Sequence, residues 1–191
     1  MNFNDPLARK RDVLNFLNTR PATSADDASV GDFLVNTFND TYAEKLPDAV
    51  LNPDREADLR DVASRRRDGG VWVVELGYQL VATFSVLKPG TEGNDAWLPE
   101  AALLRCVAVD RLFHGLRFSS LILESSKTIA TEWRASHLCL HVQRGAQGVA
   151  RTYEKFGYVR DVRGDNNFLG SMVEGYALNL RPDIYLLKTE I

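Results

Sequence analysis

The sequence predicts one α/β domain, in which a sheet of six to seven strands includes an antiparallel hairpin and a parallel pair and is covered by about four helices. The chain of 191 residues falls within the size of one ordinary domain. Apolar residues alternate as in strands in some segments and recur at helical spacing in others. The order strand, helix, strand, helix over residues 101–156 indicates two parallel strands joined by a right-handed crossover.

Composition is that of a globular protein, with 45% hydrophobic and 26% charged residues. No apolar run approaches the ~20 residues that span a bilayer, and residues 1–17 lack the apolar core of a secretion signal. We therefore expect a cytoplasmic protein without a membrane partner. The net charge of −3 argues against a nucleic-acid partner, which needs a basic field. Cys106 and Cys139 predict buried free thiols, too few for a metal framework, so no metal is expected.

The N-terminal part predicts one edge strand and one helix. Residues 1–13 are expected to extend the domain, and residues 14–22 predict a strand that Pro21 confines to a sheet edge. The capping box that starts at Ser24 predicts a helix to about Asn39, because apolar residues then recur at helical spacing.

A second helix is predicted between residues 52 and 69. Asn52 is a good N-cap, Pro53 suits the first helical position, and Gly69 ends the helical pattern. The last turn carries Arg65-Arg66-Arg67, which indicates a solvated helix C-terminus, where cations favour the helix dipole. A contact with an anionic ligand is the alternative interpretation of this run.

Two antiparallel strands follow the second helix. Residues 71–76 and 80–87 are rich in β-branched side chains, and Gly77-Tyr78 between them permits a two-residue turn with glycine first. Residues 88–100 predict a loop, in which Trp97 is expected to plug the apolar surface beneath it.

The parallel pair is predicted from two further strands and the helix between them. Residues 101–109 are almost wholly apolar, as expected of a strand covered on both faces. A helix with one apolar stripe extends to Trp133, and residues 137–143 form the next strand. A short helix over residues 149–156 ends at Gly157.

The C-terminal part predicts two closing strands, over residues 158–162 and 184–188. Between them, residues 163–182 contain glycine and asparagine and predict a long loop or insertion, of the kind that is functional or contains short elements of its own. No linker or repeat interrupts the chain, so residues 1–191 are expected to form a single domain.

A candidate anion site lies where the strand over residues 101–109 leads into its helix near Gly115. A helix N-terminus exposes unpaired N–H groups and a partial positive charge, so it binds phosphate when the entering loop allows a close approach. Gly115 removes one side chain from that approach, while Arg111, His114 and Arg117 add positive or donor groups. This geometry by itself does not specify the ligand.

The chain resembles the GNAT superfamily of acyl-CoA-dependent N-acetyltransferases over residues 24–162. In that family a strand ending in L-x-V leads into a Q/R-x-x-G-x-G/A loop; here Val107-Ala108-Val109 is followed by His114-Gly115-Leu116-Arg117-Phe118-Ser119. His114 replaces Gln or Arg, Arg117 replaces Gly, and Ser119 replaces Gly or Ala. The family's second motif, N-x-x-A-x-x-x-Y-E-K-x-G-F, matches Ala146 to Tyr158 most closely at its end, Tyr-Glu-Lys-Phe-Gly-Tyr.

The resemblance implies a mixed, mostly antiparallel sheet with a central, splayed parallel pair. It implies that acetyl-CoA, or another acyl-CoA, binds as co-substrate, with its pantetheine arm along the strand that ends at Val109. The acceptor would be a small-molecule or peptide amine, and a homodimer could cover exposed strand edges. The cofactor-binding residues would be Val107, Ala108, Val109, His114, Gly115, Leu116, Arg117, Phe118 and Ser119.

By the same resemblance, Tyr153 would be the catalytic acid that protonates the departing thiolate, which suits a phenol with a pKa near 10. A general base is expected for the amine. Many family members carry a glutamate near the position of Leu103, so Glu75, Glu100 and His141 are the remaining candidates.

Two alternatives stay open. A non-catalytic acyl-CoA-binding or sensing protein would keep the fold without the base. A Cys–His hydrolase would use Cys106 as nucleophile and His141 as its base, although a thiol in apolar surroundings tends to stay neutral.

Overall fold

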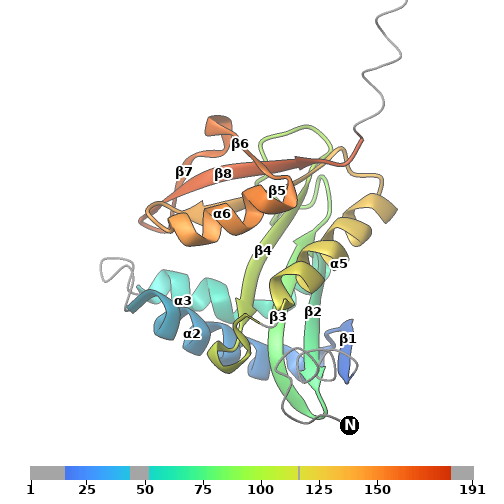
Figure 1. Ribbon diagram of the computed structural model, residues 1–191, viewed down its shortest axis with the longest axis vertical. Helices are drawn as coiled ribbons and strands as arrows, with labels where there is room; N and C mark the ends of the chain where they lie inside the picture. Colours follow the sequence, from blue (N-terminus) through green and yellow to red (C-terminus); the bar gives the residue numbers. More distant parts are fainter. Residues whose placement is uncertain (1–15, 44–51, 116, 182–191) are drawn as a thin grey trace, which may run out of the picture.

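The computed structural model describes residues 16–43, 52–115 and 117–181. Within them a single mixed sheet carries helices on both faces, which confirms the predicted fold class (Figure 1). The strand predicted over residues 184–188 and the loop residue Leu116 lie outside the described residues. None of the described helices is long and apolar enough to cross a membrane.

The strands are β1 (Leu17–Pro21), β2 (Gly69–Leu76), β3 (Gln79–Leu87), β4 (Ala102–Val109), β5 (His137–Gln143), β6 (Val159–Arg160), β7 (Asn166–Phe168) and β8 (Ser171–Asn179). The helices are α2 (Asp27–Ala43), α3 (Pro53–Arg60), α4 (Val62–Arg67), α5 (Phe118–Glu132) and α6 (Gln147–Phe156). The described residues also form three short 3-10 helices: η1 (Ser24–Asp26), η3 (Arg111–Phe113) and η4 (Val162–Gly164).

The sheet has the strand order β1-β2-β3-β4-β5-β8-β6, and β7 pairs with β8. All neighbouring pairs are antiparallel except β4 and β5, which form the predicted parallel pair. The hairpin between β2 and β3 turns at Gly77, whose φ of +63° is a conformation that glycine adopts without strain.

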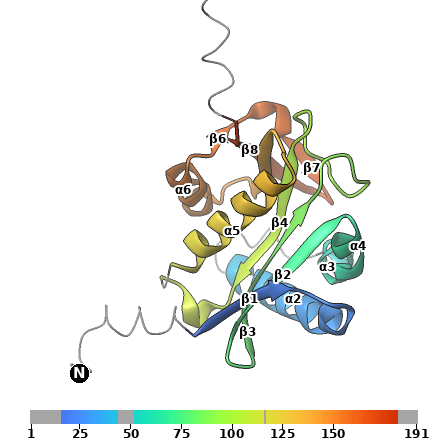
Figure 2. The same cartoon turned by 90° about the vertical axis from the view of Figure 1, so that its right-hand side faces the viewer.

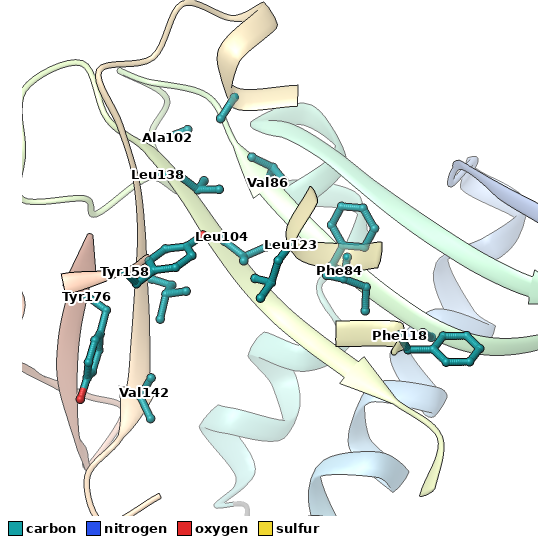
Figure 3. Packing of buried hydrophobic residues seen from close by; sticks show 14 of the residues in the cluster. Phe84, Val86, Ala102, Leu104, Phe118, Leu123, Leu138, Val142, Tyr158 and Tyr176 are labelled. Carbon is teal, nitrogen blue, oxygen red and sulfur yellow. The ribbon is translucent and has the colours of Figure 1, made fainter. Parts of the chain in front are cut away.

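The two faces of the sheet are covered by different helices (Figure 2). Helices α5 and α6 lie on one face, and α2, α3 and α4 lie on the other. On the α5 face, Phe84, Leu104, Phe118 and Leu138 belong to the largest buried cluster (Figure 3). Burial of such side chains contributes roughly 1.5–3 kcal/mol each, so this face of the sheet anchors β4 and β5.

The predicted second helix is in fact two, because the helix breaks at Asp61. The Asp61 carboxylate accepts from Ser64 N at 3.2 Å, so it ends α3 and caps α4. The expectation of a solvated arginine run was also wrong. Arg65 is 4% exposed and donates to the Asp58 and Leu59 carbonyls, and Arg66 pairs with Asp27 of α2 at 2.7 Å.

The stretch over residues 163–182 is not a long loop. It contains β7 and β8, and β8 lies between β5 and β6, pairing with β5 from His137 to Gln143. The glycine that suggested a loop, Gly175, is required by close packing, since a Cβ there would lie 2.6 Å from the Gly164 Cα. These strands raise the described total to eight, above the predicted six to seven.

Candidate active site

The central parallel pair opens into a fork. β4 and β5 are paired at only three positions, from Ala102 with Leu138 to Leu104 with Leu140. Both strands continue beyond this point, β4 to Val109 and β5 to Gln143. One edge of β4 therefore stays on β3 while its other edge faces the open fork (Figure 1).

A bulge in β4 redirects the strand at the fork. The register with β3 shifts so that Cys106 and Val107 oppose one residue, Phe84, and Cys106 adopts a φ of +52°. Beyond the bulge, Asp110 N donates to the Val81 carbonyl at 2.9 Å. Because adjacent residues direct their peptide groups to opposite edges, Val109 presents its own to the fork.

The loop after β4 leads to an N-terminus of α5 that lacks a side-chain cap. Gly115 has a φ of +77° and open space where a Cβ would lie, and Arg117, the N-cap residue, has a φ of +65°. No side-chain cap therefore occupies the first-turn N–H groups of α5, and the anion site expected there stays a prediction. His114 is placed differently, since its Nε2 lies 3.0 Å from the Val109 carbonyl oxygen.

Next to this N-terminus, a surface groove of about 210 Å³ runs between α5 and α6. The predicted residue Ser119 lines it. Phe118 does not, because its side chain is buried in the core against Phe113, so that only its backbone can face a ligand. Sequence reasoning missed the other lining residues, which are Ser120, Leu123, Thr152, Lys155 and Phe156. Helical spacing from Ser119 and Tyr153 would have indicated Leu123 and Phe156.

Tyr153 is half-buried on α6 and contacts Tyr158 edge-on, with ring centroids 5.7 Å apart. The two tyrosines differ in environment. The Tyr158 hydroxyl is buried without a hydrogen-bond partner in the described part of the chain, and burial raises its pKa well above the usual value. Figure 3 shows Tyr158 among core residues beside Leu104. Of the two, Tyr153 is the one with solvent access.

Of the three candidate bases, His141 is the one that the structure places at the fork. It follows Leu140, the last residue of β5 that pairs with β4. Glu75 pairs with Arg20 at 2.6 Å on β2, towards the far edge of the sheet, and Glu100 is exposed before the start of β4. Leu103, where the family often has a glutamate, is fully buried.

The surroundings of His141 keep its ring neutral. Burial lowers its pKa below the usual 6.5, and the charge of Asp95 and a hydrogen bond to the Gly164 backbone act in the opposite direction without offsetting it. The ring lies 5.3 Å from that of Trp97, centroid to centroid, and Nε2 lies 3.5 Å from Asn166 Nδ2. Asn166 Oδ1 has no hydrogen-bond partner among the residues described, which leaves an acceptor atom beside the ring.

The Cys–His hydrolase hypothesis finds no support in this geometry. Cys106 is 7% exposed and packs among apolar residues of α2, α4 and β2, whereas His141 contacts Trp97 and Asn166. Burial raises the pKa of the other thiol, Cys139, to about 12, which makes it inert as well.

We predict that Arg117→Gly stabilises the protein while weakening its binding of the acyl-CoA that the family resemblance implies. A left-handed φ costs a residue with a Cβ roughly 1–2 kcal/mol, partly offset by the entropy of glycine. Melting should therefore rise by about 2–4 °C, and the dissociation constant of acetyl-CoA should rise about two- to fivefold through loss of an exposed cation.

Arg134→Gly is the matched control, because Arg134 is exposed with a φ of +57° just beyond the other end of α5. It should raise the melting temperature without changing acetyl-CoA affinity. Unchanged affinity in Arg117→Gly would remove that side chain from the anion site.

Several solved structures share the architecture of this protein. A GNAT-family acetyltransferase from Staphylococcus aureus Mu50 matches with a TM-score of 0.67 and 16% identity, over 86% of this chain and 99% of that chain. An acetyltransferase from Streptococcus agalactiae 2603 matches with a TM-score of 0.65 and 14% identity, over 86% and 98%. The third is yncA from Salmonella typhimurium with its cofactor acetyl-CoA. It matches with a TM-score of 0.61 and 14% identity, over 87% of this chain and 95% of that chain.

The fold is thus that of the GNAT acetyltransferases. The model of the Acetyltransferase (GNAT) family matches residues 32–158, and the chain therefore belongs to this family. A comparison with curated protein sequences finds no match.

Proposed function

We propose that the protein is an N-acetyltransferase that moves an acetyl or other short acyl group from acyl-CoA to a primary amine by direct attack in a ternary complex. The observation that carries this proposal is the fork itself. There the edge of β4 that pairs with no strand, at Val109, is followed by a short loop and the N-terminus of α5, which has no side-chain cap. A peptide-like arm and a phosphate group can be bound there together.

The residues of the donor side fit an acyl-CoA. The first turn of α5 and the groove that includes Ser119 and Lys155 would hold the phosphates, with Arg117 as an added cation. The Val109 peptide would bond the pantetheine amide. His114 would release the Val109 carbonyl when the donor binds, since its ring nitrogen occupies that acceptor in this structure.

On the other face, His141 would take a proton from the acceptor amine. Its lowered pKa keeps it neutral and able to accept a proton at pH 7. The amine nitrogen forms the new bond to the acyl carbon while the bond from that carbon to sulfur breaks. Tyr153 then gives its hydroxyl proton to the departing thiolate, and solvent restores it.

Two measurements test this function. Acetyl-CoA at about 100 times its dissociation constant should add ~2.7 kcal/mol and raise the melting temperature by about 5–10 °C. A panel of primary amines should then give steady release of free thiol. A thermal shift without thiol release from any amine would favour the sensing protein, and no shift at millimolar acetyl-CoA would contradict both functions.

A further inference from the structure

Two arginines share one carboxylate on the face of the fork opposite α5. Arg105 of β4 donates from Nη2 to Asp58 Oδ1 at 3.1 Å, and Arg55 of α3 donates to the other oxygen of the same group. Both guanidinium groups stack on the Phe168 ring of β7, at 4.8 Å for Arg105 and 5.2 Å for Arg55. The ring holds both cations in place without neutralising them.

The charges in this cluster do not balance by direct contact. Two cations meet one carboxylate, and all three side chains are no more than 23% exposed. Asp95 acts electrostatically on Arg105, and it is exposed and forms no hydrogen bond with it in the described structure. Arg105 uses one guanidinium nitrogen on Asp58, so its other N–H donors can bind a second anion.

The cluster lies next to the reacting position. Leu104 and Leu140 are the last paired residues of the two central strands, so the residues that follow them, Arg105 and His141, lie on the same face where the strands part. A hydrogen bond links the β7–β8 turn to the start of α3: Asn52 Nδ2, of the N-cap residue, donates to the Leu169 carbonyl at 2.7 Å. The charge of Arg105 contributes to the lowered pKa of His141, which agrees with their placement on one face.

We infer that the acceptor is an amine that also carries a carboxylate, as a free amino acid does, and that Arg105 and Arg55 bind this carboxylate while the amine faces His141. The inference rests on the proposed transferase function and specifies its substrate class. A planar carboxylate matches the paired donors of a guanidinium. It would also supply the second negative charge that the cluster lacks.

The first test compares acceptors that differ only in the carboxylate. With acetyl-CoA saturating, kcat/KM is measured for phenylalanine and phenethylamine, for leucine and isoamylamine, and for β-alanine and ethylamine. The amino acid of at least one pair should be preferred by about 10- to 100-fold, as hydrogen bonds to a charged group imply. Equal use of both members in every pair, or preference for the amines, would overturn the inference while leaving the transferase function intact.

The second test uses variants of the cluster. Arg55→Gln and Arg105→Lys should lower kcat/KM for the preferred amino acid by about tenfold or more, and change that for its matched amine by less than about threefold. Arg60→Gln, on the exposed side of the same helix, is the control and should change neither. An equal loss for both acceptors would assign the arginines a structural role only.

The thermal shift with acetyl-CoA verifies that each variant is folded and binds the donor. If no acceptor of either kind releases thiol, the proposed function fails with its substrate class. Calorimetric titration of the acetyl-CoA complex with the amino acids then decides whether the arginines bind carboxylates at all. An absence of binding there would overturn the inference independently.

Discussion

Tyr153→Phe is expected to lower kcat by about 10²-fold or more, because proton transfer by a positioned acid contributes roughly 10²–10⁴-fold. The phenyl ring preserves the edge-on contact with Tyr158, at 5.7 Å between centroids, so the fold and the packing of α6 should be retained. Affinity for acetyl-CoA should change little. Steady-state thiol release and a thermal shift with acetyl-CoA measure the two effects separately.

The matched control is Tyr158→Phe. The Tyr158 hydroxyl is buried without a partner in the described structure, so its removal should leave turnover near the wild-type value and stabilise the protein by up to about 1 kcal/mol. If Tyr158→Phe abolished turnover and Tyr153→Phe did not, Tyr158 would be the acid and our assignment of Tyr153 would be wrong.

His141→Gln is expected to reduce kcat/KM at pH 7 by about 10²-fold, since glutamine cannot accept the proton of the amine. In the wild type, protonation of His141 removes the base. Because burial lowers its pKa below 6.5, the rate should fall only when the pH drops below that value. In the variant, the fall in rate below the pKa of His141 should disappear. Its rate should instead follow deprotonation of the free amine and rise at more alkaline pH.

His137→Gln is the control for this change, because His137 lies at the start of β5 with its Nδ1 on the Ser136 hydroxyl, before the fork opens. It should keep both the rate and the fall in rate at acidic pH. An unaltered pH profile in His141→Gln would show that water or another group accepts the proton.

Much of the fold could be predicted because it depends on neighbouring residues. The turn at Gly77 and the end of α6 at Gly157 both require positive φ, which glycine adopts without strain. The alternating pattern of β2 and β3 and the strand–helix–strand order of the parallel pair were equally local. The motif from Tyr153 to Tyr158 then indicated the family, which the family model confirmed.

What the sequence by itself determined, therefore, was the order of elements up to α6, apart from the break between α3 and α4, together with the family and the helix that carries Tyr153. The tertiary structure decided where β4 leaves β5, that β8 inserts beside β5, and that Arg55, Asp58 and Arg105 meet on Phe168. These features join residues far apart in the chain. The point where a strand pair ends, the insertion of a strand from later in the chain and the sharing of a carboxylate by two cations depend on burial and on distances between elements, and no local pattern of residues encodes them.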